Sequence, residues 1–131
     1  EMLAAGIEVA FGQDCVMDPW YSLGSADMLE VAHMGLHVAQ MTGQEAMKAC
    51  FNAVTVAPAK ILGLADYGLK VGCYADMVVL DAGDAIEAIR LRATRRYVIR
   101  RGVVISQSQA ARAQLNLSAR PSSVDFRLSR Q

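Results

Sequence analysis

The sequence predicts an α/β chain in which a helical half is followed by a half made mainly of β-strands. Over residues 28–62, apolar side chains recur three and four positions apart, which is typical of helices with a buried face. A continuous apolar run at residues 77–81, and two apolar segments on either side of residues 101–102, are typical of strands. Gly68 and Gly72 lie between the segment with the helical pattern and the segment with the strand pattern, so the change from helix to strand is expected near them.

A short strand is expected before the first helix. Residues 6–11 contain Ile7, Val9 and Phe11 and end at Gly12, which indicates a buried strand that closes on a loop. The loop over residues 12–24 is too irregular for a helix. It brings together polar and aromatic side chains: Asp14, Cys15, Asp18, Trp20 and Tyr21. We therefore expect a functional site in this loop.

Three helices are expected next. The first covers residues 28–39 and can be capped by Ser25 or Asp27. Because it is apolar almost all round, it should be buried on more than one face. The second covers residues 44–56, and the third begins at Pro58, a residue suited to a first helical turn.

The second half should contain a buried strand at residues 77–81, a helix at residues 84–91 and two strands around a turn at Arg101-Gly102. Beyond Ser106 the residues are polar, with scattered leucine and arginine. We expect a tail that is extended or ordered only by packing on something else.

Charge and composition narrow the classes of partner. The 13 basic and 13 acidic side chains cancel to a formal net charge of zero, so neither nucleic acid nor a membrane is an expected partner. The most apolar stretch, residues 28–41, is shorter than the roughly 20 residues that cross a bilayer and is interrupted by polar side chains. A soluble protein is therefore expected. Three separated cysteines fit neither a disulfide framework nor a zinc knuckle, so a reducing, cytoplasmic setting is expected. Because residues 1–6 lack a secretory signal and Met2 is not the first residue, we expect the sequence to begin within a longer protein.

Two blocks of the sequence resemble the amidohydrolase superfamily. The block FGQDCVMDPWY at residues 11–21, followed by HMGLHV at residues 33–38, closely resembles the end of the catalytic barrel in bacterial cytosine deaminases. The block PAKILGL at residues 58–64, followed by ADMVVLD at residues 75–81, resembles the passage from such a barrel into a small β-sandwich.

The resemblance implies a division of the chain into three parts. Residues 1–62 would be the last strand and helices of a (β/α)8 TIM-like barrel, residues 63–106 strands of the small amidohydrolase β-sandwich, and residues 107–131 a C-terminal tail.

The resemblance also implies a chemistry for the loop. Asp14 would stand at the C-terminal end of the eighth barrel strand, as a metal ligand and a catalytic residue. A carboxylate there can bind a divalent metal, iron or zinc, and take a proton from the metal-bound water, which then attacks an amidine carbon and releases ammonia. Trp20 would lie at the substrate pocket, where a planar indole suits a planar, nucleobase-like small molecule.

Two positions depart from the cytosine deaminase pattern. Cys15 stands where that family has a second aspartate, and Gln13 stands where it has a histidine. A neutral thiol is less polar than a carboxylate, so Cys15 should form a less hydrated wall of the substrate pocket. A cytosine substituted at C5, isoguanine and other cyclic amidines are therefore all open as substrates.

The same residues have plainer interpretations. Taken alone, Asp14 would be a turn or helix-cap residue, Cys15 a small buried hydrophobe and Trp20 a packing anchor. His33 and His37 have the spacing of zinc protease ligands, but Met34 stands where the glutamate should be, so we prefer a packing role.

Charged residues in the β half have plainer interpretations too. The arginine cluster is expected at a solvated strand edge: Arg95, Arg96, Arg100 and Arg101. Asp76 and Asp81 should serve turns.

Two hypotheses of different classes follow. In the first, the chain is the C-terminal portion of a deaminase whose other metal ligands, histidines on the first, fifth and sixth strands, lie outside these 131 residues. Because an open metal site needs about three protein ligands, the chain alone should bind metal weakly and be inactive. In the second, the chain is a non-catalytic structural unit that forms a homo-oligomer through exposed apolar patches.

Overall fold

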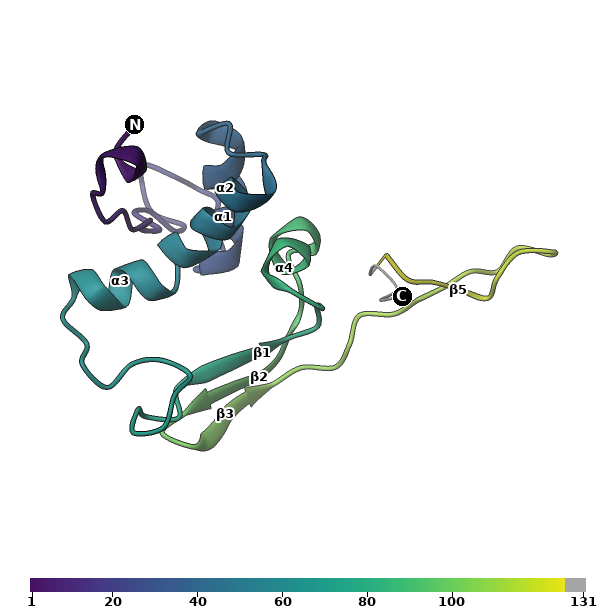
Figure 1. Cartoon of the computed structure of the whole chain (residues 1–131). Coiled ribbons are helices and arrows are strands. Elements are labelled where there is room, and N and C mark those ends of the chain that lie inside the picture. The colour runs from purple at the N-terminus through teal and green to yellow at the C-terminus, as the bar shows by residue number, and fades with distance from the viewer. Residues whose placement is uncertain (127–131) are drawn as a thin grey trace.

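The computed structural model describes residues 1–126. The first half holds a short 3-10 helix and three α-helices: η1 (Leu3–Ala5), α1 (Met28–Val38), α2 (Gln44–Ala53) and α3 (Val56–Ile61). The second half holds a helix and five strands: β1 (Met77–Leu80), α4 (Ala85–Leu91), β2 (Arg95–Arg100), β3 (Val103–Gln107), β4 (Ala113–Gln114) and β5 (Ser123–Val124). The helical half followed by a β half is as predicted. Figure 1 shows the helices grouped together, the sheet of β1, β2 and β3 to one side, and an arm with β4 and β5 extending away.

Helix α4 joins the two halves, because it packs against both α1 and α2 while its ends continue into β1 and β2 (Figure 1). The core holds small and aliphatic side chains from these helices: Leu29, Ala32, Leu36, Cys50, Ala88, Ile89 and Ala93. Ile89 is fully buried, which contributes roughly 1.5–3 kcal/mol to folding.

The strand predicted at residues 6–11 does not form. Its backbone bonds run to other parts of the chain, with the Ile7 N–H donating to the Met2 carbonyl and the Phe11 N–H to the Ala53 carbonyl at 2.9 Å. Apolar, β-branched composition favours a strand only where a neighbouring strand pairs with it. Among residues 1–126, no strand lies beside this segment.

Helix α1 begins at its predicted cap. The Asp27 carboxylate accepts the Leu29 N–H at 2.7 Å, while Ser25 donates its hydroxyl to the Glu30 carboxylate at 2.6 Å. The predicted burial on several faces is wrong, since Met34 is 54% and Val38 is 77% exposed. In the part of the chain that the structure describes, α1 packs against α2 and α4, and its buried residues have the spacing of one helix face: Leu29, Ala32 and Leu36.

The second predicted helix ends earlier than expected, at Ala53. The backbone of Thr55 leaves the helical region, and its hydroxyl donates to the Phe51 carbonyl at 2.8 Å. Helix α3 then starts two residues before Pro58, which still lies in the first turn, where a missing N–H leaves no helical bond unmade.

The three-stranded sheet is antiparallel with β2 in the centre. The predicted turn is present, and Arg101 (φ 51°) and Gly102 (φ 77°) have the positive φ pair of a tight hairpin turn. As predicted, Asp76 serves this turn, because its carboxylate accepts the Arg101 N–H at 2.6 Å. The predicted burial of β1 is wrong, since Val78 is 47% and Val79 is 43% exposed.

The helix predicted at residues 84–91 is confirmed as α4, with Asp84 capping it through the Glu87 N–H at 2.9 Å. The expected extended tail contains the short antiparallel pair β4–β5, and Arg90 donates to the Phe126 carbonyl at 2.5 Å. Residues 127–131 of the predicted tail lie outside the described residues. Every helix within residues 1–126 is too short or too polar to cross a bilayer.

Candidate functional site

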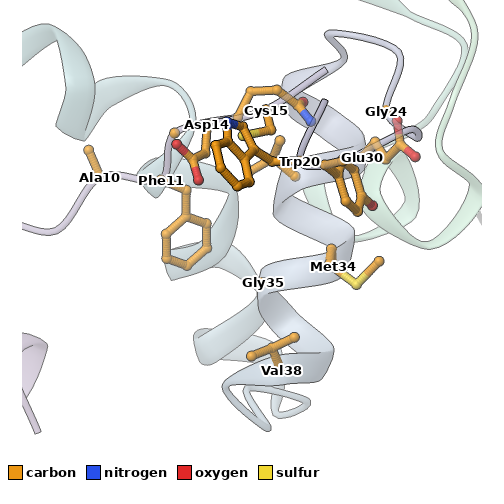
Figure 2. A pocket seen from close by; sticks show the side chains of 14 residues that line it. Ala10, Phe11, Asp14, Cys15, Trp20, Gly24, Glu30, Met34, Gly35 and Val38 are labelled. Atoms are coloured by element: carbon orange, nitrogen blue, oxygen red, sulfur yellow. The ribbon is translucent and has the colours of Figure 1, made fainter. Parts of the chain in front are cut away.

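A hollow of about 680 Å³ lies between α1 and the segment that precedes it (Figure 2). We call residues 12–26 the site loop. The three residues predicted for the site all line the hollow: Asp14, Cys15 and Trp20. Figure 2 shows them at one end, with Met34 and Val38 of α1 at the other. Sequence reasoning missed the helix side of the lining, although Val31, Met34 and Val38 have the three- and four-residue spacing of one helix face.

Close packing of Phe11 on Gly35 forms part of the hollow (Figure 2). A Cβ added at Gly35 would lie 2.6 Å from the Phe11 ring, closer than carbon atoms can approach. A larger residue at this position of α1 would therefore force the Phe11 ring to move. Together with the bond from Phe11 to Ala53, this contact fixes where the site loop starts.

The site loop has an irregular backbone. Asp14 (φ 62°), Met17 (φ 48°) and Ala26 (φ 55°) are non-glycine residues in the left-handed region, where such residues cost roughly 1–2 kcal/mol each. Gly24 (φ 92°) also has a positive φ. Such a conformation persists only where surrounding contacts impose it.

Asp18 supplies the principal contacts inside the loop. Its carboxylate accepts the N–H groups of Trp20 and Tyr21, each at 2.9 Å, and the Met17 N–H donates to the Leu23 carbonyl at 3.1 Å. The sequence signal for this turn was present, because an aspartate followed by proline commonly bonds to the backbone two residues later. Asp18 thereby shapes the segment that presents Trp20.

The electrostatics of Cys15 favour a neutral thiol. A hydrogen bond to the Asp18 carboxylate, then partial burial and then the charge of Asp14 raise the pKa of Cys15 above its ordinary value. The same hydrogen bond, followed by the amides of Trp20 and Tyr21, lowers the pKa of Asp18. At neutral pH Cys15 is therefore a weakly polar wall and not a thiolate nucleophile.

Trp20 and Asp14 are both exposed at the edge of the hollow. The indole is 89% exposed, so Trp20 is not a packing anchor within the described residues. Asp14 lines the hollow beside it, and Figure 2 shows the carboxylate on the side of Phe11 and the indole. A flat apolar surface and a carboxylate thus border one space.

Gln13, which has no role assigned from the sequence, also lines the hollow. Its Oε1 is buried without a hydrogen-bond donor among the described residues, a situation that costs roughly 1–3 kcal/mol. A Cβ added at Gly24 would lie 3.2 Å from its Nε2, so Gly24 leaves room for this side chain.

His33 and His37 do not border the hollow. Their rings lie edge to face with centroids 4.8 Å apart, and the Nδ1 atom of His33 is buried without a partner among residues 1–126. His33 is partly buried and His37 is exposed, so the packing role preferred from the sequence stays a prediction.

Part of the arginine cluster differs from its prediction, since Arg100 and Arg101 are exposed but Arg95 and Arg96 are partly buried. Arg95 does not lie at a solvated edge, because both terminal nitrogens of its guanidinium bind the Asp27 carboxylate. Arg101 lies over the ring of Tyr74, 3.6 Å from its centroid, and Arg96 donates to the Ser108 carbonyl at 3.1 Å. Pairing between distant parts of the chain cannot be deduced from a run of like charges.

The described residues do not offer the full ligand set of a divalent metal. No group of three His, Cys, Asp or Glu side chains placed to hold a metal ion occurs within residues 1–126. An open catalytic metal site uses about three protein ligands. Asp14 with its described neighbours therefore does not fit a tightly held ion.

The chain is similar in sequence and structure to several known enzymes. Residues 1–106 match the model of the amidohydrolase family. The 5-methylcytosine deaminase from Klebsiella pneumoniae, solved with 5-fluorocytosine, is 38% identical with a TM-score of 0.82 over 87% of this chain and 28% of that one. A pterin deaminase from Rhizobium rhizogenes is 33% identical over 82% of this chain and 24% of its own length.

An N-isopropylammelide isopropylaminohydrolase from Burkholderia multivorans is 35% identical, with a TM-score of 0.77 over 80% of this chain and 27% of that one. The chain thus spans about a quarter of the length of these relatives. They are hydrolases and deaminases of small heterocycles. The match over residues 1–106 shows that the chain belongs to the amidohydrolase family.

Proposed function

We propose that this chain forms part of the active site of an enzyme that hydrolytically deaminates a nucleobase or a related cyclic amidine. The observation that carries the proposal is the arrangement of Asp14, Cys15 and Trp20 around one hollow. The similarity to deaminases of pterins and of 5-methylcytosine supports it.

Each of the three residues has a role in such a reaction. Water adds to the amidine carbon, the bond from that carbon to the amino nitrogen breaks, and the products are a carbonyl group and ammonia. A group must accept a proton from the water and return it to the leaving nitrogen, and the Asp14 carboxylate at the edge of the hollow can do both. The exposed indole of Trp20 offers a stacking surface for the planar ring.

Cys15 should affect which substrate ring the site prefers. Its protonated thiol, held by Asp18, offers a compact and weakly polar surface beside Asp14. A carboxylate at this position would be hydrated and would disfavour an apolar substituent. We propose that the site accepts a pyrimidine with a small apolar group at C5 more readily than cytosine itself, with isoguanine as the other candidate.

The metal belongs to the complete enzyme in this proposal. Amidohydrolases generally use a divalent metal, and here iron or zinc would have Asp14 as one ligand. The ion would polarise the attacking water. Because one carboxylate binds such an ion weakly, we expect the isolated chain to release no ammonia.

A chimera tests the proposal. The C-terminal quarter of the Klebsiella pneumoniae enzyme is replaced by this chain, and ammonia release is measured with cytosine, 5-methylcytosine and isoguanine. Turnover of one of these bases supports the proposal. A folded, metal-loaded chimera that turns over none of them contradicts it. Changing Cys15→Asp in the same chimera should shift the preference towards cytosine.

An alternative is favoured by a separate observation. Strand β3 is exposed along its length, with Val103 at 63%, Val104 at 51% and Ile105 at 60%. An exposed apolar edge strand promotes self-association, so a homo-oligomeric structural unit is the second candidate function. Sedimentation velocity over a range of concentrations tests it, and a monomer throughout would reject it.

A further inference from the structure

One ion pair connects the sheet to the site loop. The guanidinium of Arg95 donates from both terminal nitrogens to the Asp27 carboxylate, one of the bonds being 2.7 Å. The two residues are 68 positions apart in the sequence. Asp27 also caps α1 and comes directly after the site loop. The carboxylate that ends the loop is thus bound by both halves of the molecule.

The sheet fixes the backbone that carries Arg95. This residue begins β2 and is paired with Leu80 of β1. Immediately before it, the Thr94 carbonyl accepts the Asp81 N–H at 2.9 Å. The Arg95 side chain is 35% and the Asp27 side chain 22% exposed, so water competes less for this pair than for a fully exposed one. A two-pronged guanidinium contact also fixes direction, which a single ammonium contact does not.

The end of the site loop lies next to this contact. Gly24 and Ala26, just before Asp27, both have positive φ, and Ser25 between them binds Glu30, which lines the hollow. A chain in this conformation needs a fixed point at each end. The packing of Phe11 on Gly35 supplies one, and the Asp27–Arg95 pair supplies the other.

We propose that Arg95 is a positioning residue for the site, holding the C-terminal end of the site loop through Asp27. This proposal rests on the proposed function only because that function makes the loop part of an active site. The sheet half, which contributes no side chain to the hollow, would thereby control the shape of the hollow.

Hydrogen exchange of individual amides, followed by NMR on the whole chain, tests this without any turnover. In Arg95→Gln, the amides of Met17, Trp20 and Tyr21 should exchange about tenfold faster, because the charge-assisted bond that holds the C-terminal end of their loop is lost. The core amides of Cys50 and Ile89 should change less than twofold. Arg100→Gln, an exposed arginine on the same strand, is the matched control and should change neither group.

A second variant separates the ion pair from the helix cap. Asp27→Asn keeps one oxygen that can cap α1, but the NH2 group that replaces the other oxygen cannot accept the second N–H of Arg95. It should reproduce the faster loop exchange and also keeps the test decisive if Arg95→Gln fails to fold. Unchanged loop exchange in the folded variants would overturn the proposal. So would equal acceleration of loop and core amides, because that would indicate a general loss of stability. A failed chimera with a positive exchange result would reject the proposed function and leave the positioning role standing.

Discussion

The helical core and the site loop are held by different kinds of interaction. Around Ile89, side chains of α1, α2 and α4 exclude water, and this part of the chain keeps regular backbone geometry. The site loop has three non-glycine residues with positive φ, keeps Trp20 exposed and is ordered mainly by polar contacts through Asp18 and Asp27. Burial therefore supplies the stability of the molecule, while a few directional bonds supply the shape of the hollow.

The largest effect should come from the core. Ile89→Ala removes a fully buried side chain and should lower the free energy of unfolding by about 2–5 kcal/mol. Urea denaturation followed by circular dichroism measures it. Ile105→Ala, at a side chain that is 60% exposed, should cost far less. Equal losses in the two variants would show that the described core does not carry the stability.

Gly35→Ala should have the next largest effect on stability, because it disturbs the contact between α1 and the start of the site loop. The added methyl group would overlap the Phe11 ring, and relieving the overlap should cost about 1–3 kcal/mol and move the start of the site loop. Denaturation gives the energy and the chemical shifts of the Phe11 ring give the movement. Gly12→Ala is the control, since a Cβ there meets nothing within 4 Å. An unshifted Phe11 ring in Gly35→Ala would contradict the packing described.

A smaller effect is expected from pH acting on Asp27. Burial alone would raise the pKa of Asp27, but the bonds from Arg95 and the Leu29 N–H outweigh it and the pKa is lowered. A lowered folded pKa stabilises the fold above the unfolded value of about 3.9, and this contribution is lost as pH falls through the folded value. Asp27→Asn should therefore lose less stability than the unmodified chain on going from pH 5 to pH 3. Parallel stability curves would contradict the lowered pKa.

The smallest effect is local to the loop. Asp18→Asn removes the carboxylate that chiefly raises the pKa of Cys15, so alkylation of this thiol should reach half its maximal rate at a lower pH. Iodoacetamide labelling read by mass spectrometry at Cys15 measures the shift. Cys73 provides an internal control in the same sample. An unchanged pH profile at Cys15 would show that Asp18 does not control the thiol.

Local signals in the sequence predicted local structure well. Asp27 caps α1 and the Arg101-Gly102 turn joins β2 to β3, because each depends on a few adjacent residues. The prediction of a strand at residues 6–11 was wrong because a strand needs a pairing partner, which the composition of the segment does not reveal. The Asp27–Arg95 pair was missed for a similar reason, since it joins residues 68 positions apart.

The candidate site was predictable in part. A family resemblance picked out Asp14, Cys15 and Trp20, and the fold places all three around one hollow. The contact of Phe11 with Gly35 was not foreseen, because it depends on how the segment before the loop packs on α1. The division into barrel end, β-sandwich portion and tail stays a prediction.

The function of Asp14 is the central claim, and one comparison of rates tests it most directly. In the chimera with the Klebsiella pneumoniae enzyme, Asp14→Asn should lower kcat for ammonia release by about 10²–10⁴-fold, the usual worth of a general acid–base group. Glu45→Gln, at an 86% exposed carboxylate on α2, should leave kcat unchanged. If the two variants released ammonia at the same rate, Asp14 would not carry the chemistry proposed for it.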